Sequence, residues 1–152
     1  MFQVVLYKPE IPPNTGNIIR LCANMGCYLH LIHPLGFHLD DKKLRRAGLD
    51  YQELTTVTEH HSYQAMLENL VPSRIFACST KGRTNYHTPS YQSGDTFIFG
   101  SETHGLPTSI LEQYKPENVV RIPMRTASRS INLANAVGII LYEAWRQNNF
   151  RM

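Results

Sequence analysis

Three segments of this 152-residue chain carry polar side chains in patterns that suit chemistry. The first runs from Asn14 to Arg20 and reads Asn-Thr-Gly-Asn-Ile-Ile-Arg. Asn17 and Arg20 stand one helical turn apart, so on a helix they face the same side. The planar guanidinium of Arg20 is suited to binding a phosphate or a carboxylate. A solvated arginine on a helix surface accounts for the same residue equally well.

The second segment, Gly100 to Pro107, reads Gly-Ser-Glu-Thr-His-Gly-Leu-Pro and follows a short apolar run. It places Glu102 and His104 between two glycines, which allow the backbone to approach a ligand closely. It is not a phosphate-binding P-loop, because no lysine and hydroxyl follow the second glycine, and the chain has no G-x-G-x-x-G dinucleotide fingerprint. A tight turn between a strand and a helix is the alternative interpretation.

The third segment extends from Arg121 to Gly138 and predicts a strand, a loop of small polar residues and then a helix. Ile122 and Pro123 end the strand, because proline cannot donate to the ladder of hydrogen bonds. Residues 128–132 offer hydroxyls, amides and backbone donors with little bulk, which is typical of a ligand-binding loop. The alternative is a simple connection in which Ser130 or Asn132 caps the following helix.

Metal binding and nucleophilic catalysis are less well supported. Cys22, Cys27, His30 and His33 lie within a dozen positions. Alternate strand residues point to opposite faces, so Cys27 and His30 diverge, and a zinc site is disfavoured. Cys78 at a predicted strand end is a possible acyl-transfer thiol, but a buried cysteine is commoner. No G-x-S-x-G serine motif occurs.

The amino-acid composition narrows the possible classes of protein further. The chain is 42% hydrophobic and 18% charged, which predicts one soluble globular domain over residues 1–152. A net charge of +3 permits RNA binding without requiring it. An odd set of three cysteines fits a reducing cytoplasm. We expect no membrane span and no secretory signal, because the apolar runs are too short.

The elements that must position these segments alternate along the chain. Strands are predicted at residues 2–7, 28–32, 54–57, 74–78, 96–99 and 119–122, and helices at 14–25, 62–70, 108–114 and 133–147. Asn14 is the predicted cap of the first helix, residues 40–47 are a short helix or irregular segment, and residues 79–94 are a surface loop. This alternation predicts an α/β fold with a mainly parallel sheet flanked by helices. In such sheets ligands lie beyond the carboxyl ends of strands, here after Tyr7, Cys78, Phe99 and Ile122.

Taken together, the three segments resemble the SPOUT superfamily of RNA methyltransferases. The matching motifs are Asn14-x-Gly16-Asn17-x-x-Arg20, Phe99-Gly100-x-Glu102-x-x-Gly105-Leu106-Pro107, and Ile122-Pro123-Met124 with Ser130-x-Asn132-Leu133-x-Asn135. The short length, the opening Leu-Tyr-x-Pro-Glu-Ile-Pro and the later His-Pro-Leu-Gly are most similar to the tRNA wobble-position cytidine/uridine ribose 2'-O-methyltransferases. Ile131 and Ala134 depart from the usual leucine or methionine and the common serine.

The resemblance implies a SPOUT fold with a C-terminal trefoil knot and a homodimer with its active site at or near the interface. It implies S-adenosyl-L-methionine as methyl donor, S-adenosyl-L-homocysteine as product, and no metal. The implied substrate is the tRNA anticodon stem-loop, with methylation of the ribose 2'-hydroxyl of C34 or modified U34. An enzyme with these partners belongs in the cytoplasm and away from membranes.

The resemblance also assigns roles to individual residues. The residues implied to bind the methyl donor are Cys78, Gly100, Gly105, Ile122, Met124, Ser130 and Leu133. Gly100 and Gly105 are expected to keep that pocket open. The implied catalytic residues are Arg20, aided by Asn17, Glu102 and Ser130. Arginine stays protonated, so Arg20 is expected to orient the hydroxyl and stabilise the developing alkoxide rather than act as a base. The residues expected to contact RNA are Arg20, Lys81, Arg83, Arg125 and Arg129.

Three alternatives stay open at the level of sequence. A 2'-O-methyltransferase acting on another tRNA position or on ribosomal RNA would share the same motifs. A non-catalytic RNA-binding module would bind tRNA but not the methyl donor. A nucleotide-binding oxidoreductase is disfavoured by the missing dinucleotide fingerprint.

Overall fold

Strands form the centre of the computed structural model, which describes residues 1–39 and 57–151. Within these residues seven strands pair in the order β3-β2-β1-β6-β4-β7-β5, and every pairing is parallel. The strands are β1 (Gln3–Tyr7), β2 (Tyr28–Ile32), β3 (Val57–His60), β4 (Ile75–Cys78), β5 (Thr84–Asn85), β6 (Thr96–Phe99) and β7 (Val119–Arg121). The helices are α1 (Pro12–Met25), α4 (Tyr63–Leu70), α5 (Thr108–Leu111), α6 (Leu133–Gln147) and the 3-10 turn η1 (Pro116–Asn118). The predicted parallel α/β sheet is therefore confirmed.

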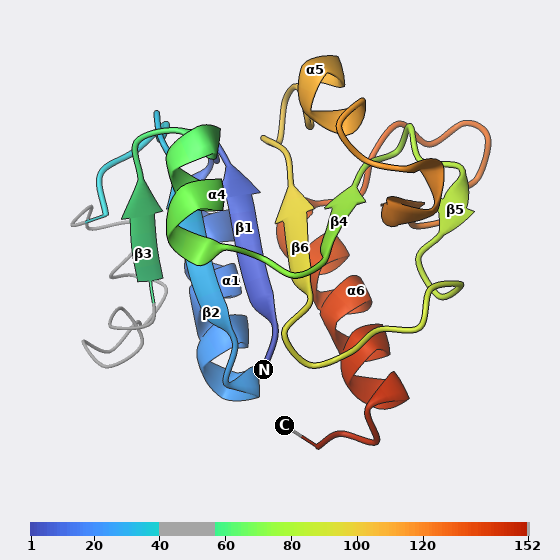
Figure 1. Cartoon of the computed structure of the whole chain (residues 1–152). Helices are drawn as coiled ribbons and strands as arrows, with labels where there is room; N and C mark the ends of the chain where they lie inside the picture. Colours follow the sequence, from blue (N-terminus) through green and yellow to red (C-terminus); the bar gives the residue numbers. More distant parts are fainter. Residues whose placement is uncertain (40–56, 152) are drawn as a thin grey trace.

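Helices cover both faces of this sheet, with α4 on one face and α1 and α6 on the other (Figure 1). The main core lies on the second face, where Leu6 and Leu29 from the strands pack in one cluster with Ile18 of α1 and Val137 of α6. A smaller cluster on the α4 face contains Met66. Because both faces are covered, the strands read as nearly continuous apolar runs.

The start of α1 differs from the predicted one. Asn14 was expected to cap the helix, but the helix begins at Pro12, and the cap position is Ile11, which makes no side-chain cap hydrogen bond. Proline suits the first helical positions, because its fixed φ is already helical and its missing N–H has no partner there. The side chain of Asn14 is buried and bonds to other segments instead. The predicted end of the helix at Gly26 is confirmed, with φ of 67°.

The helix α6 runs from Leu133 to Gln147, as predicted, and Asn132 is its cap. The Asn132 side-chain oxygen accepts hydrogen bonds from the backbone N–H groups of Ala134 at 3.0 Å and Asn135 at 3.3 Å. This resolves the choice left open between Ser130 and Asn132 as the capping residue. Among the described helices, none is both long enough and apolar enough to cross a membrane.

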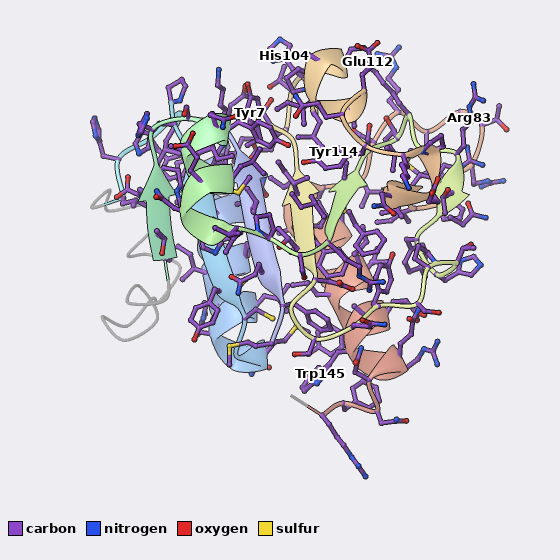
Figure 2. The ribbon with its side chains drawn as sticks, viewed as in Figure 1. Tyr7, Arg83, His104, Glu112, Tyr114 and Trp145 are labelled. Carbon is purple, nitrogen blue, oxygen red and sulfur yellow. The ribbon has the colours of Figure 1, made fainter. Side chains whose placement is uncertain are left out.

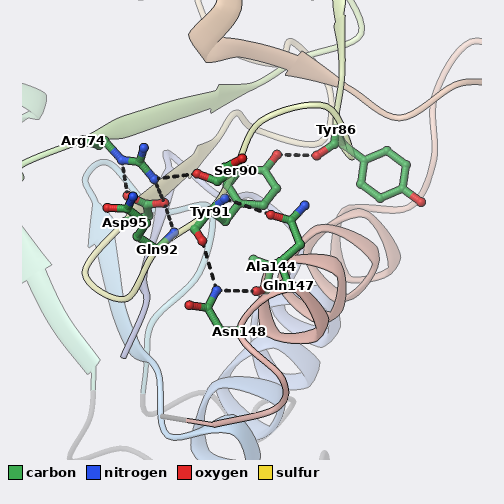
Figure 3. Close-up of polar contacts among 9 residues, drawn as sticks. All are labelled: Arg74, Tyr86, Ser90, Tyr91, Gln92, Asp95, Ala144, Gln147 and Asn148. Carbon is green, nitrogen blue, oxygen red and sulfur yellow. Dashed lines mark hydrogen bonds and ion pairs between the residues drawn. The ribbon is translucent and has the colours of Figure 1, made fainter.

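Residues 79–94 are not the plain surface loop that their composition predicted. Thr84 and Asn85 form β5, which pairs with β7 at the sheet edge. Tyr91 is buried, donates its N–H to the Gln147 side chain at 2.9 Å and accepts from Asn148 through its carbonyl at 3.1 Å (Figure 3). At the end of the segment, Asp95 receives a hydrogen bond from Arg74 at 2.7 Å. Arg74, which directly precedes β4, also donates to the carbonyl of Ser90 at 3.0 Å, so the segment is fastened to the end of α6 and to Arg74.

Two further predictions concern the third strand and the knot. The predicted segment 40–47 and the first three residues of the predicted strand 54–57 lie outside the described residues. The described strand runs on from Val57 to His60. The C-terminal trefoil knot stays a prediction that comes from the resemblance.

Candidate active site

A cleft of about 570 Å³ lies where the carboxyl ends of four parallel strands meet. Each of the loops that follow these strands contributes to its lining. The lining includes Ile11 and Asn14 after β1, residues 78–81 after β4, residues 99–106 after β6, and Ile122, Met124 and residues 129–133 after β7. His104 marks this end of the molecule in Figure 2. The four loops predicted from the topology are confirmed as the ones that meet.

Part of this cleft is apolar. Leu133 is buried, and Ile122 is half-buried and packs against the main core. Cys78 ends β4, and its thiol donates a hydrogen bond to the carbonyl of Phe76 at 3.7 Å. Burial raises the pKa of the Cys78 thiol well above its usual range, so the thiol stays protonated. A protonated thiol is a poor nucleophile, which disfavours acyl transfer at Cys78 and leaves it as a lining residue.

The turn after β6 requires glycine at two positions. A Cβ on Gly100 would lie 1.9 Å from the carbonyl carbon of Gly105, a distance that no side chain tolerates. Gly105 has φ of 67° and donates its N–H to the carbonyl of Ser101 at 2.9 Å. A left-handed φ of this kind is readily adopted by glycine. Gly100 thus allows the turn to fold back onto the end of β6, which is a different role from keeping the pocket open. A Cβ on Gly105 would meet no atom within 4 Å, so the expectation that Gly105 keeps the pocket open stays a prediction.

The carboxylate of Glu102 joins this turn to the loop after β1. Its Oε2 accepts a hydrogen bond from the backbone N–H of Glu10 at 2.8 Å. Its Oε1 accepts from the backbone N–H of Ile11 at 3.1 Å and from the Asn14 side-chain amide at 3.1 Å. Three donors therefore converge on one half-buried carboxylate, which ties the turn after β6 to the start of α1.

Asn14 extends this contact to the third segment. Its side-chain oxygen accepts a hydrogen bond from the side-chain amide of Asn132 at 2.9 Å, and Asn132 caps α6 with its own oxygen. Asn14 is 7% exposed, so both ends of its amide are satisfied inside the protein. One chain of hydrogen bonds thus links the three segments whose residue patterns suited chemistry in the sequence.

Residues 1–142 match the family model described as the SpoU rRNA Methylase family. The chain belongs to the SpoU methylase family. It is 60% identical over 147 residues to the tRNA (cytidine(34)-2'-O)-methyltransferase of Escherichia coli (strain K12), covering 97% of this chain and 94% of that protein. It is 55% identical over 150 residues to the protein of the same name from Methylovorus glucosotrophus, covering 99% and 97% of the two chains.

Solved structures agree with this membership. A structure described as giving insights into the 2-OH methylation of C/U34 on tRNA superposes with a TM-score of 0.91 and 44% identity, over 99% of this chain and 98% of that one. A SpoU methyltransferase from Streptomyces viridochromogenes in complex with AdoMet has a TM-score of 0.82 at 24% identity, over 97% of this chain and 57% of that one. At that lower identity the likeness shows the fold alone.

The residues predicted to bind the methyl donor come together in this SpoU methylase. Those that line the cleft are Cys78, Gly100, Gly105, Ile122, Met124, Ser130 and Leu133. Glu102, predicted as a catalytic helper, also lines it. Asn17 and Arg20 lie on α1, one turn apart as predicted. Both are exposed, and among the described residues that line the cleft neither occurs. Their catalytic role stays a prediction.

The basic residues predicted to contact RNA are all exposed in the SpoU methylase chain. Lys81 and Arg129 line the cleft itself. Arg125 lines a separate shallow hollow with residues 126–128. Arg83 lies beside the edge strand β5 (Figure 2). Their exposure leaves them accessible to a large polyanion.

Sequence reasoning missed one contact at the mouth of the cleft. The Thr103 hydroxyl donates to the carboxylate of Glu10, and His104 Nδ1 lies 3.7 Å from Glu10 Oε1. The hydroxyl of Thr103 and the nearby His104 lower the pKa of the Glu10 carboxyl. In the sequence, Glu10 stands out only because prolines lie on both sides of it. This pattern does not indicate a partner 93 residues away. Over residues 1–39 and 57–151, no three His, Cys, Asp or Glu side chains gather as a metal site.

Proposed function

We propose that this protein transfers a methyl group from S-adenosyl-L-methionine to the ribose 2'-hydroxyl of the wobble nucleotide of tRNA, C34 or modified U34. The observation that carries this proposal is the 60% identity, over nearly the full length of both chains, to the E. coli enzyme named for that reaction. The cleft at the carboxyl edge of the sheet, built from the three matching motifs, provides a site for the chemistry. The enzyme works in the cytoplasm, where tRNA is found.

The cleft suits the methyl donor in size and character. Pockets for small molecules and cofactors commonly measure about 300–1,000 Å³ and combine apolar walls with a few polar groups. Here Leu133 and Ile122 provide apolar surface, and Ser130 and the backbone of residues 100–105 provide polar groups. S-adenosyl-L-methionine supplies an electrophilic methyl on a sulfonium and leaves as S-adenosyl-L-homocysteine. Cys78, Met124 and Gly105 complete the proposed contacts.

As the 2'-hydroxyl oxygen bonds to the methyl carbon, the bond between that carbon and the sulfonium breaks, and the hydroxyl proton passes to an acceptor other than Arg20, such as solvent water. We assign to Arg20 the orientation of this hydroxyl and the stabilisation of its developing negative charge, because a guanidinium remains protonated and cannot serve as a base. Asn17, one turn earlier on α1, and Ser130 in the cleft assist in holding the ribose. Alignment of two bound reactants supplies much of the acceleration in such a reaction.

A homodimer brings Arg20 and a cleft together in this proposal, since Arg20 is exposed on α1 outside the lining of its own cleft. Exposed apolar residues on α6 and before α1 offer a surface for a second copy. They are Ile139 at 37%, Tyr142 at 45% and Ile11 at 44% exposure. The active site then lies at or near the interface between copies.

The tRNA anticodon stem-loop binds over the mouth of the cleft. Lys81, Arg83, Arg125 and Arg129 are placed to contact its phosphates, a contribution that weakens as salt rises. Arg20 contacts the RNA next to the reacting ribose.

The deciding experiment incubates purified tRNA and this protein with methyl-labelled S-adenosyl-L-methionine, followed by nucleoside analysis and mapping of the modified position. We expect 2'-O-methylated C34 or U34. Methyl groups on a base, on another position, on ribosomal RNA only, or on no RNA would each contradict the proposal.

A further inference from the structure

The polar contacts that join the three motifs have an order and a direction. Glu102 accepts from Asn14, Asn14 accepts from Asn132, and Asn132 accepts from the first backbone N–H groups of α6. Each asparagine thus donates toward Glu102 and accepts on its other side. An amide reversed at either position would bring two donors or two acceptors face to face.

Among these three residues, Glu102 accepts hydrogen bonds but donates none. The donors around it require a side chain of this kind. Its two oxygens receive the N–H groups of Glu10 and Ile11 in addition to the Asn14 amide. A glutamine would offer one oxygen and would turn an NH₂ group toward an N–H donor. The negative charge also lies at the N-terminus of α1, where the helix dipole favours an anion.

The chain of contacts ends at the two places that the reaction must align. Asn132, at one end, caps α6 and lines the cleft. Asn14, in the middle, lies in the first turn of α1, the helix that carries Arg20 about 9 Å further along its axis at 1.5 Å per residue. A shift in the first turn of α1 therefore moves Arg20 relative to the cleft.

We infer that Glu102, Asn14 and Asn132 form a positioning relay that holds α1, and with it Arg20, in register with the methyl-donor cleft. In this role Glu102 is a positioning residue, since the donors to its oxygens are the backbone N–H groups of Glu10 and Ile11 and the side chain of Asn14. The inference rests on the proposed function for what Arg20 does, but the geometry of the relay is independent of the substrate.

The test exchanges the carboxylate at position 102 and the amide at position 14. In Glu102→Gln an NH₂ group faces an N–H donor, and in Asn14→Asp two carboxylates face each other, so each single variant should lower kcat for tRNA methylation about 10- to 100-fold. In the double variant the introduced glutamine can donate to the introduced aspartate, which restores the pairing between these two positions, and we expect kcat to recover about tenfold over either single variant. The KM for tRNA should change less than about threefold throughout. A double variant no better than the product of the two single losses would overturn the relay.

Two readouts do not depend on methylation. Hydrogen exchange at the backbone amides of Glu10 and Ile11 should accelerate about 10-fold or more in Glu102→Gln, since a single amide oxygen replaces two carboxylate oxygens, while exchange in β1 stays unchanged. Binding of S-adenosyl-L-homocysteine, measured by calorimetry, should weaken less than about fivefold. Unchanged exchange at Glu10 and Ile11 would contradict the relay even if the wild-type protein proved inactive on tRNA, so the two proposals fail separately.

Asn132→Ser keeps the measurement interpretable if the other variants fold poorly. Serine is a good helix cap, so α6 stays capped, but the donor to Asn14 is lost. We expect a folded protein with kcat lowered about 3- to 10-fold. Glu112→Gln, at the exposed end of α5, is the matched control for removing a carboxylate and should retain wild-type values. Wild-type kcat in Asn132→Ser would also overturn the inference.

Discussion

The two walls of the cleft differ in how they are held. The fixed wall, residues 100–106 with Ile11 and Asn14, is joined by the hydrogen bonds of Glu102 and by the close contact of Gly100 with Gly105. The open wall is the loop of residues 122–131, whose two ends line the cleft. This loop is largely exposed, and within it the Ser128 N–H donates to the carbonyl of Arg125 at 2.8 Å.

This difference matches two tasks of a methyltransferase. Aligning a nucleophile with a methyl group requires groups held within a fraction of an ångström, which a densely bonded wall provides. Admitting a nucleotide and a large RNA requires accessible residues that can adapt, which an exposed loop with Arg125 and Arg129 provides. We therefore expect changes to the fixed wall to affect turnover or folding, and changes to the open wall to affect binding.

The largest effect on activity should follow Arg20→Ala, since the fixed wall holds the helix that carries this residue. If Arg20 stabilises the developing alkoxide as proposed, loss of its charge should lower kcat about 100- to 1,000-fold. Binding of S-adenosyl-L-homocysteine, measured by calorimetry, should stay near the wild-type value, because Arg20 does not line the cleft of its own chain. Wild-type turnover in this variant would remove Arg20 from the mechanism.

The fixed wall itself can be broken with Gly100→Ala. The added Cβ meets the Gly105 backbone at 1.9 Å, so the turn must move, and we expect a loss of about 3 kcal/mol in the free energy of unfolding, at the upper end of the usual cost of overpacking. Urea denaturation measures this loss. Gly138→Ala is the control, because its Cβ would meet only the Leu21 side chain at 3.8 Å within a helix, and alanine is the better helix former there. Equal stability of the two variants would show that the turn is not tightly held.

A buried pair of histidines away from both walls allows the stability of the fold to be tested without changing the cleft. His30 and His60 are buried on neighbouring strands, with His30 Nδ1 at 3.0 Å from His60 Nε2, and His30 Nε2 lies 2.9 Å from the Gln3 side chain. Burial, with a smaller effect of His60, lowers the pKa of His30 to about 4. Burial also lowers the pKa of His60.

Acidification should therefore destabilise the fold at this pair. Below about pH 6.5, His30 takes up a proton in the unfolded chain, whereas in the folded protein it stays neutral until the pH nears 4. The free energy of unfolding therefore decreases from its value at neutral pH as the pH falls toward 4. We expect a loss on the order of 2 kcal/mol in urea unfolding, with a shallower pH dependence in His30→Gln than in the wild-type protein. His87→Gln, at an exposed position, is the control. An identical pH dependence in all three proteins would refute this account.

The smallest effect should come from the open wall. Arg125→Ala removes one exposed charge outside the cleft, so tRNA affinity should fall only a few-fold, and the slope of log K against log salt should become less steep by about 0.7–0.9. Filter binding over a range of salt measures both. Arg151→Ala removes an exposed charge that lines neither the cleft nor the hollow of Arg125, and it should leave the slope unchanged. A change in kcat with no change in slope would place Arg125 with the fixed wall instead.

Much of this architecture follows from local sequence signals. The alternation of apolar strands with amphipathic helices determined the parallel sheet, and therefore the edge at which the loops after Tyr7, Cys78, Phe99 and Ile122 meet. Gly26 as a helix end and Leu133 as the start of α6 were also predictable, because the capping hydrogen bonds at these two ends join only groups close by in the sequence.

Other features depend on which distant segments meet, and only the tertiary structure decided them. Asn14 has the residue type of a helix cap, but it lies inside α1, where it bonds to Glu102 and Asn132, 88 and 118 positions away. Tyr91 lies in a polar stretch but is buried against α6. Gly100 was expected to leave space for a ligand, but the space belongs to the backbone of Gly105. A side chain's residue type states what it can bond to, and the fold alone determines which partner comes within reach.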